Sequence, residues 1–203
     1  TPRPVTQFMV DMVNPQLGEQ VLDFACGTGG FLVCALEHLR KQVHNIDDEK
    51  QLQKSILGVE KKPLPHMLCT TNLILHNIDN PQIKHDNSLG YPVKDIKPKD
   101  KVDIILTNPP FGSTVNGAEK PYLSTFELGN TYDKKGKAKP RKNQSSEVLF
   151  VERICEFLKP GTGKAAIVLP DGILTNSSSQ YVRDFILERF QLLAVVSLPQ
   201  CAF

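Results

Sequence analysis

Two kinds of short apolar segment alternate along the chain. One is a run of four to seven residues rich in Val, Ile and Leu, typical of a buried strand; the other places apolar residues three or four positions apart, typical of a helix. This alternation favours an α/β fold, with a mostly parallel sheet and helices on both faces. The predicted strands are residues 20–24, 55–59, 82–85, 102–107, 164–169 and 192–198, and the predicted helices lie within residues 5–13, 31–39, 67–78, 148–158 and 181–186.

The composition is that of an ordinary globular protein, with 40% hydrophobic and 23% charged residues among 203. No apolar run approaches the roughly 18–20 residues of a membrane-spanning helix, and no secretory signal is visible. The five cysteines include no CxxC pair, which argues against a disulfide framework or a zinc ribbon. We therefore expect a cytoplasmic protein without a metal. The chain starts without Met and stops abruptly, which we interpret as a fragment of a larger protein.

Residues 23–31 form a glycine-rich connection between the first predicted strand and the next helix. Glycines there let the backbone approach a ligand closely, and the helix N-terminus offers unpaired N–H groups. The spacing lacks the third glycine of a dinucleotide-binding loop. Asp23, at the end of the strand, instead suits a ligand with a positively charged amino group, which fits the methionine end of S-adenosylmethionine. The alternative is a plain tight turn.

A carboxylate that binds a ribose is expected at the end of the second strand. The usual distance of about 20 residues points to Asp47 or Asp48. The apolar pattern instead places the second strand at residues 55–59, with Glu60 at its end. We favour Glu60, and residues 45–50 are then predicted to be a solvated insertion.

Asn108, Pro109, Pro110 and Phe111 follow the most apolar predicted strand. The side-chain carbonyl of Asn108 and the backbone carbonyl of Pro109 are two acceptors that can take both protons of an exocyclic amine. Phe111 offers a ring on which a planar base can stack, worth about 1–3 kcal/mol per base. Hydrogen bonds to both N–H groups favour a pyramidal nitrogen with an available lone pair, so this pattern indicates methylation of an amine conjugated into a ring. A strand-ending turn that merely contains prolines is the alternative.

These motifs resemble those of amino-methyltransferases that use S-adenosylmethionine. They look most like the modification (M) subunit of type I restriction-modification systems, an adenine-N6 DNA methyltransferase family. The sequences Asp-x-Ala-Cys-Gly-Thr-Gly-Gly-Phe and Asn-Pro-Pro-Phe carry the resemblance. Residues 1–4 are similar to the family's opening cofactor motif, residues 58–63 and 72–76 to its second-strand region, and residues 158–161 and 169–172 to its fifth-strand region.

The resemblance implies that residues 1–203 are the Rossmann-like catalytic domain of a larger subunit, with the family's final antiparallel strand missing. It implies S-adenosylmethionine as the cofactor, a flipped-out adenine in double-stranded DNA as the substrate, and the specificity subunit and the restriction subunit as partners. The implied catalytic residues are Asn108, Pro109, Pro110 and Phe111, and the implied cofactor-binding residues are Thr1, Pro2, Arg3, Asp23, Ala25, Gly27, Thr28, Gly29, Gly30, Glu60, Asp86 and Asn87. Asp86 stands where the family has a glycine, so either of the last two residues can be the one that contacts the cofactor adenine.

Residues 112–146 interrupt the alternation and are too long for an idle connection. Basic side chains beside aromatic ones can grip phosphates, so we predict a basic loop that contacts DNA near the active site; a solvated mobile loop is the alternative. A protein-glutamine methyltransferase and a non-catalytic assembly module stay open as other functions, although this loop and residues 1–4 favour DNA and the intact acceptors favour catalysis. The basic residues are Lys134, Lys135, Lys137, Lys139, Arg141 and Lys142, and the aromatic ones are Tyr122, Phe126 and Tyr132.

Overall fold

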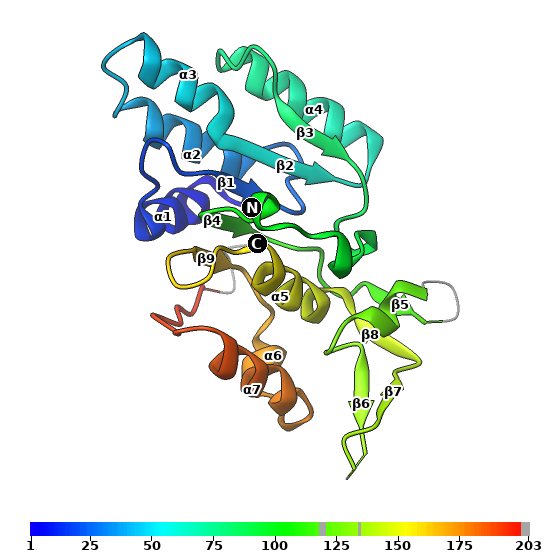
Figure 1. Ribbon diagram of the computed structural model, residues 1–203. Coiled ribbons are helices and arrows are strands. Elements are labelled where there is room, and N and C mark those ends of the chain that lie inside the picture. The colour runs from blue at the N-terminus through cyan, green and yellow to red at the C-terminus, as the bar shows by residue number, and fades with distance from the viewer. Residues whose placement is uncertain (118–120, 134, 200–203) are drawn as a thin grey trace.

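Five parallel strands form the central sheet of the computed structural model, which describes residues 1–117, 121–133 and 135–199. The strand order is β3-β2-β1-β4-β9, so the chain builds the sheet outward in one direction and then in the other, starting from β1 (Figure 1). In open sheets, ligands bind at the carboxyl ends of the strands beside such a reversal. The strands are β1 (Val21–Asp23), β2 (Ile56–Glu60), β3 (Gln82–His85), β4 (Ile104–Thr107) and β9 (Lys164–Ile167).

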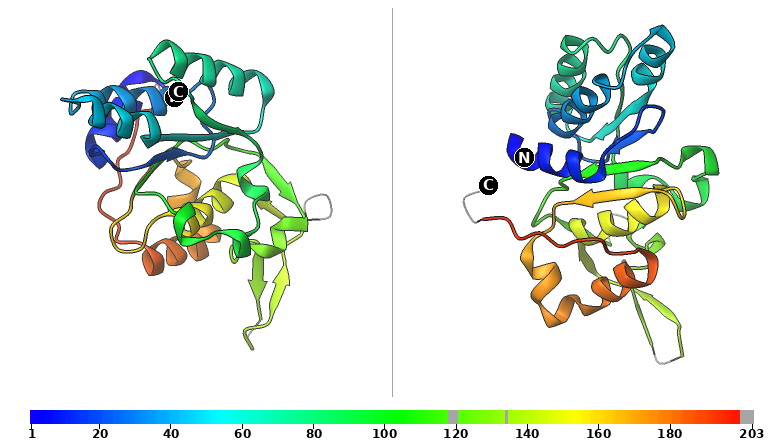
Figure 2. Two further views of the ribbon diagram at one scale, coloured as in Figure 1. Left: turned by 45° about the horizontal axis from the view of Figure 1, so that its top comes forward. Right: turned by 90° about the vertical axis from the view of Figure 1, so that its left-hand side faces the viewer.

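Helices cover both faces of this sheet, as the apolar pattern predicts (Figures 1 and 2). The first four helices pack on one face and the last three lie on the other, and short 3-10 helices connect β3 to β4. The helices are α1 (Arg3–Val13), α2 (Gly30–Arg40), α3 (Ile46–Ser55), α4 (Pro63–Leu75), α5 (Ser146–Phe157), α6 (Asp171–Thr175) and α7 (Gln180–Arg189). The 3-10 helices are η1 (Ser88–Gly90), η2 (Val93–Asp95), η3 (Pro98–Asp100), η4 (Pro121–Thr125) and η5 (Ser177–Ser179).

Successive side chains of a strand point to opposite faces, and this produces two apolar cores. In β4, Ile104 and Leu106 pack in the core shared with α1, α2 and α4, whereas Ile105 packs in the core shared with α5. All three side chains are fully buried. Because burial of each such side chain contributes about 1.5–3 kcal/mol, β4 is held firmly at the centre of the domain. Asn108 follows it directly.

Residues 45–50 lie at the surface, as a solvated insertion would, but they form the start of helix α3 instead of an insertion. The Asn45 side chain caps this helix: its oxygen accepts hydrogen bonds from the backbone N–H groups of Asp47 and Asp48, both at 2.9 Å. The acidic first turn also suits the positive end of the helix. The helix is missed by apolar periodicity because Leu52 is the one large apolar side chain that it buries.

The predicted strand at residues 192–198 is wrong, because the described residues after α7 form no strand. Leu193 and Val195 in this segment are 80% and 60% exposed. An apolar run becomes a strand only where a neighbouring strand satisfies its N–H and C=O groups. Among the described residues, β9 pairs with β4 and takes no second partner.

The described part of residues 112–146 contains two small antiparallel sheets instead of only the predicted loop. Strand β5 (Thr114–Asn116) pairs with β8 (Asn143–Ser145), and β6 (Asn130–Tyr132) pairs with β7 (Ala138–Pro140). The hairpin of β6 and β7 projects away from the central sheet (Figures 1 and 2). None of these strands exceeds three residues, which is too short for an apolar alternation to reveal it.

Candidate active site

The predicted site residues gather at the carboxyl ends of the central strands. The glycine-rich loop follows β1, Glu60 ends β2, and Asn108 follows β4 on the other side of β1. These three features therefore surround the reversal of strand order, where an open sheet binds its ligands.

The loop between β1 and α2 is shaped by positive backbone angles and a close contact. Gly27 and Gly29 have φ angles of 55° and 89°, which favour glycine. A Cβ at Gly29 would lie 2.9 Å from the Sγ atom of Cys69 on α4, whereas a Cβ at Gly27 would meet nothing within 4 Å. The loop is thus packed against α4 at Gly29 and leaves open space beside Gly27, where a ligand can approach the backbone.

Asp23 lies beneath this loop and is only 1% exposed. Its Oδ1 atom accepts hydrogen bonds from the Ala25 backbone N–H at 3.0 Å and from the Thr107 hydroxyl at 2.7 Å. Burial raises the pKa of the Asp23 carboxyl to about 7, although these two hydrogen bonds oppose the shift. The Asp23 carboxyl is therefore enclosed by the protein, and its charge changes near neutral pH.

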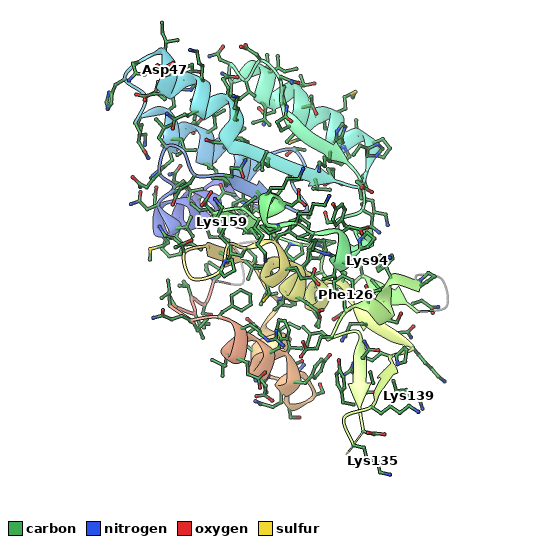
Figure 3. The ribbon with its side chains drawn as sticks, viewed as in Figure 1. Asp47, Lys94, Phe126, Lys135, Lys139 and Lys159 are labelled. Atoms are coloured by element: carbon green, nitrogen blue, oxygen red, sulfur yellow. The ribbon has the colours of Figure 1, made fainter. Side chains whose placement is uncertain are left out.

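Glu60 holds the loop from the neighbouring strand. Its Oε2 atom accepts a hydrogen bond from the Gly27 backbone N–H at 2.9 Å, and its Oε1 atom accepts one from the Lys62 N–H at 2.7 Å. By contrast, Asp47 and Asp48 lie in the first turn of α3, distant from the loop (Figure 3 labels Asp47). Of the three carboxylates considered for the ribose, the structure brings Glu60 alone to the glycine-rich loop.

Asn108 is held by a residue 107 positions away. Its Nδ2 atom donates a hydrogen bond to the Thr1 hydroxyl at 2.8 Å. Its Oδ1 atom is buried and has no hydrogen-bond partner among the described residues. Pro109 is buried, whereas the Phe111 ring is 42% exposed. The strand end therefore holds a buried, unsatisfied acceptor beside an accessible aromatic ring.

Ser146, at the start of α5, is a site residue that the sequence did not indicate. Its hydroxyl donates to the Pro110 carbonyl at 3.0 Å, and its backbone N–H donates to the Ser113 carbonyl at 2.8 Å. These bonds tie the Asn-Pro-Pro-Phe turn to a buried helix. The signal available in the sequence was the Ser-Ser-Glu start of that helix, which is typical of an N-terminus but not of a contact with residue 110.

The opening segment lies beside both loops. Thr1 contacts Asn108, and the Thr6 methyl group lies 4.0 Å from the position of a Cβ at Gly30. The Arg3 guanidinium forms an ion pair with Glu37 on α2. Pro2 stands immediately before α1, where it fixes the backbone for the helix start. The segment thus joins the cofactor-loop side of the site to the Asn108 side.

Asp86 and Asn87 follow β3, and the insertion reaches one of them. The Asn87 amide donates a hydrogen bond to the Tyr122 hydroxyl at 3.4 Å, and its Oδ1 atom accepts one from Leu89 N–H. The Asp86 backbone N–H donates to the Glu60 carbonyl at 3.2 Å. Tyr122, which the sequence assigned only to the basic loop, therefore adds an aromatic side chain from the insertion to this corner.

The described residues contain neither a cluster of metal-binding side chains nor a membrane-spanning helix. No group of three or more His, Cys, Asp or Glu side chains lies close enough together there to hold a metal ion. No helix among the same residues is both long enough and apolar enough to cross a membrane. Cys26, Cys34, Cys69 and Cys155 are free thiols, and Cys201 lies outside the described residues.

Comparison with known proteins decides the family. The sequence model of the N-6 DNA methylase family matches residues 1–203. The chain belongs to the N-6 DNA methylase family. It is 43% identical over 207 residues to the methylase subunit of the type I restriction enzyme EcoEI of Escherichia coli, covering 100% of this chain and 39% of that protein. It is 30% identical to the EcoKI methylase subunit of strain K12, covering 37% of that protein.

Solved structures of similar proteins have the same fold. A type I modification subunit from Vibrio vulnificus YJ016 superposes with a TM-score of 0.77 at 42% identity, covering 92% of this chain and 37% of that one. The EcoKI M protein superposes with a TM-score of 0.69 at 27% identity, with the same coverage of each chain. A class I S-adenosylmethionine-dependent methyltransferase from Listeria monocytogenes, 20% identical, shares the fold with a TM-score of 0.63. The chain spans less than two fifths of the length of its curated type I relatives.

Proposed function

We propose that this chain is the catalytic part of an S-adenosylmethionine-dependent methyltransferase that methylates the N6 amine of adenine in DNA. The observation that carries the proposal is the placement of Asn108, with its unsatisfied Oδ1 atom: it follows β4, next to the strand that leads into the glycine-rich loop and across that strand from Glu60. Membership of the N-6 DNA methylase family supports the same reaction. The naming of its relatives as type I methylase subunits supports a role as the modification subunit of such a system.

The residues around the glycine-rich loop fit S-adenosylmethionine. The open space beside Gly27 leaves room for the ligand, and the N-terminus of α2 supplies unpaired N–H groups for its carboxylate. The buried charge of Asp23 attracts its amino group, and Glu60 suits the ribose hydroxyls. Asp86 or Asn87, together with Tyr122, would lie beside the adenine of the cofactor. When bound, the cofactor supplies an electrophilic methyl group on a sulfonium.

The chain's own residues prepare the target amine. Asn108 Oδ1 and the Pro109 carbonyl accept the two N–H groups, which keeps the nitrogen lone pair out of conjugation with the ring. Phe111, partly exposed beside them, stacks on the flipped base. Asn108 Oδ1 and the Pro109 carbonyl would hold the amine while its nitrogen takes up the methyl group and then loses one proton. No general base is needed before the attack, because the amine reacts through its lone pair.

We expect cofactor affinity to increase as the pH rises from 6 to 7.5. The Asp23 carboxyl, whose pKa burial raises to about 7, is mostly protonated at pH 6 and mostly ionised at pH 7.5, and a cationic amino group is attracted to the ionised form. If that form alone binds, the dissociation constant falls by roughly tenfold over this range. Calorimetric titrations at several pH values measure it. Asp23→Asn keeps an acceptor for the Ala25 N–H, and this variant should bind the cofactor weakly, with an affinity that does not change with pH. An affinity that does not change with pH in the unmodified protein would contradict the assignment of Asp23.

DNA contact is assigned to the β6–β7 hairpin. Lys135, Lys137 and Lys139 are exposed on it, and Figure 3 shows Lys135 at the tip of the hairpin and Lys139 along β7. Lys134 lies outside the described residues. A two-stranded ribbon of this kind fits a DNA groove, and its cations neutralise phosphates.

The base of the hairpin is fixed to the body of the domain. Glu152 of α5 accepts hydrogen bonds from the Glu127 and Leu128 N–H groups, both at 2.7 Å. The Asn130 amide donates to the Phe126 carbonyl at 2.6 Å. Arg141 lies over the Tyr181 ring, with 4.3 Å between its Cζ atom and the ring centroid. Arg141 is therefore assigned to the structure of the hairpin, and the lysines to DNA.

We expect the 203-residue chain to bind DNA weakly, without sequence preference, and less tightly as salt increases. Replacing Lys135, Lys137 and Lys139 with Gln removes cations that neutralise phosphates, so the slope of log affinity against log salt should flatten by about 0.9 for each phosphate left unneutralised. Fluorescence anisotropy over a salt series measures this slope. Replacing Lys41, Lys50 and Lys54, which lie on the α2–α3 side, is the matched control and should leave the slope unchanged. Tight, sequence-selective binding would place recognition in this chain rather than in a specificity subunit.

The reaction itself is tested by measuring methyl transfer from labelled cofactor. The full-length subunit is assayed with its specificity subunit and, in parallel, with the restriction subunit added. Double-stranded DNA and a glutamine-containing protein are offered as alternative acceptors. Mass spectrometry of the product nucleosides separates N6-methyladenine from N4-methylcytosine. Label in N6-methyladenine supports the proposal, whereas label in protein glutamine or in cytosine, or no transfer at all, contradicts it. A cytoplasmic location follows from the proposed action on cellular DNA.

A further inference from the structure

The Asn108 side chain is oriented by one hydrogen bond that reaches it from outside its own turn. That bond runs from Nδ2 to the Thr1 hydroxyl, over 2.8 Å. The other end of the carboxamide, Oδ1, is buried and makes no hydrogen bond with any described residue. One end of the amide is therefore held, and the other end lacks a partner among the described residues.

Orientation matters because the two ends of a carboxamide have opposite roles. Oδ1 accepts hydrogen bonds, whereas Nδ2 only donates them. A target amine donates its protons, so it can form a hydrogen bond with Oδ1. If the Asn108 carboxamide were rotated by about 180°, the amine would face Nδ2, which is also a donor. A partner that accepts from Nδ2 therefore favours the productive orientation and polarises the amide, which strengthens Oδ1 as an acceptor.

A buried acceptor without a partner also constrains how the target enters. An unsatisfied buried oxygen costs free energy, and it recovers that cost when it meets a donor. Because Oδ1 is covered in this structure, the incoming base must displace the atoms over it before the hydrogen bond can form. While those atoms move, the hydrogen bond between Nδ2 and the Thr1 hydroxyl keeps the Asn108 carboxamide from rotating.

We propose that Thr1 is a positioning residue for methyl transfer: its hydroxyl holds the Asn108 carboxamide so that Oδ1 faces the target amine. This inference rests on the proposed function. It differs from the role that family resemblance implies for residues 1–4, which is contact with the cofactor. In this role the Thr1 side chain serves the target base, while Thr6 and the start of α1 pack at the cofactor loop.

The test compares Thr1→Val, Thr1→Ser and the unmodified protein, each as the full-length subunit assembled with its specificity subunit. Valine keeps the shape of the side chain and removes the hydroxyl, whereas serine keeps the hydroxyl. Thr71→Val, on the exposed side of α4, is the matched control. The measurements are kcat and KM for methyl transfer to DNA and the dissociation constant of S-adenosylmethionine by calorimetry.

We expect Thr1→Val to lower kcat roughly tenfold, consistent with the loss of one hydrogen bond to a reacting group, with cofactor affinity within twofold of the original. Thr1→Ser should recover most of the loss, and Thr71→Val should match the unmodified protein. A fall in cofactor affinity as large as the fall in kcat, an unchanged or higher kcat, or no recovery with serine would each overturn the proposal. Failure of the proposed function is distinguished because the unmodified assembly would then not methylate adenine in DNA.

Discussion

Replacement of Asn108 by alanine is expected to reduce methyl transfer at least about a hundredfold, an effect typical of losing one charge-stabilising group at a reacting centre. The side-chain oxygen is the acceptor that the target amine needs, and in the free protein it has no partner among the described residues. Its loss removes an interaction made with the reacting nitrogen, so the effect should fall on kcat. Single-turnover transfer of labelled methyl groups to DNA measures it.

Cofactor affinity separates this catalytic role from a general loss of structure. Asn108 follows β4, whereas the glycine-rich loop follows β1, and the side chain of Asn108 bonds to Thr1 rather than to that loop. The Asn108→Ala protein should therefore bind S-adenosylmethionine within about twofold of the original constant. Asn143→Ala, on β8 outside the proposed site, is a matched control. Near-normal turnover in the Asn108 variant would refute the mechanism.

Replacement of Glu60 by alanine is expected to weaken S-adenosylmethionine binding by about 1.5–3 kcal/mol, through loss of charge-assisted hydrogen bonds to the ribose hydroxyls. The structure adds a second effect. The same carboxylate accepts the N–H groups of Gly27 and Lys62, so its removal leaves two backbone donors without their acceptor. The free energy of unfolding should therefore also fall, as urea denaturation of the free protein would measure.

Two further variants separate the loss of cofactor affinity from the loss of stability. Glu60→Gln keeps one side-chain oxygen as an acceptor, so it should recover part of the stability while binding the cofactor more weakly than the original protein. Asp48→Ala removes a carboxylate of the same kind from the start of α3, where it accepts the His44 N–H, and should leave cofactor affinity unchanged. Calorimetry that found a larger loss for Asp47→Ala or Asp48→Ala than for Glu60→Ala would contradict the assignment of the ribose carboxylate.

The sequence predicted those parts of the molecule whose signals are local. A short apolar strand followed by closely spaced glycines predicts the β1–loop–α2 unit, because positive φ angles at Gly27 and Gly29 are a property of those residues. The strand before Asn108 was also evident, since β4 is buried on both faces and every residue in it is apolar or Thr. The alternation of such elements is enough to predict the parallel sheet and the edge of that sheet at which Glu60 and Asn108 both lie.

Local patterns failed where structure depends on a partner or on capping. Helix α3 is stabilised by the Asn45 cap and an acidic first turn, with almost no apolar stripe to reveal it. Residues 192–198 have the composition of a strand but form none, because the described residues give that segment no neighbour with which to pair. The short strands of the insertion exist only through cross-strand hydrogen bonds, such as those that join β6 to β7.

The contacts that give the site its orientation were decided by tertiary structure alone. Thr1 reaches Asn108 across 107 positions, Ser146 reaches the carbonyl of Pro110 across 36, and Tyr122 reaches Asn87 across 35. Each contact joins a side chain to an element that comes near it only after the sheet and its helices have packed. The residue types at a site follow from the sequence because chemistry limits them, whereas hydrogen-bond distances and directions follow from packing between segments that are distant in the chain.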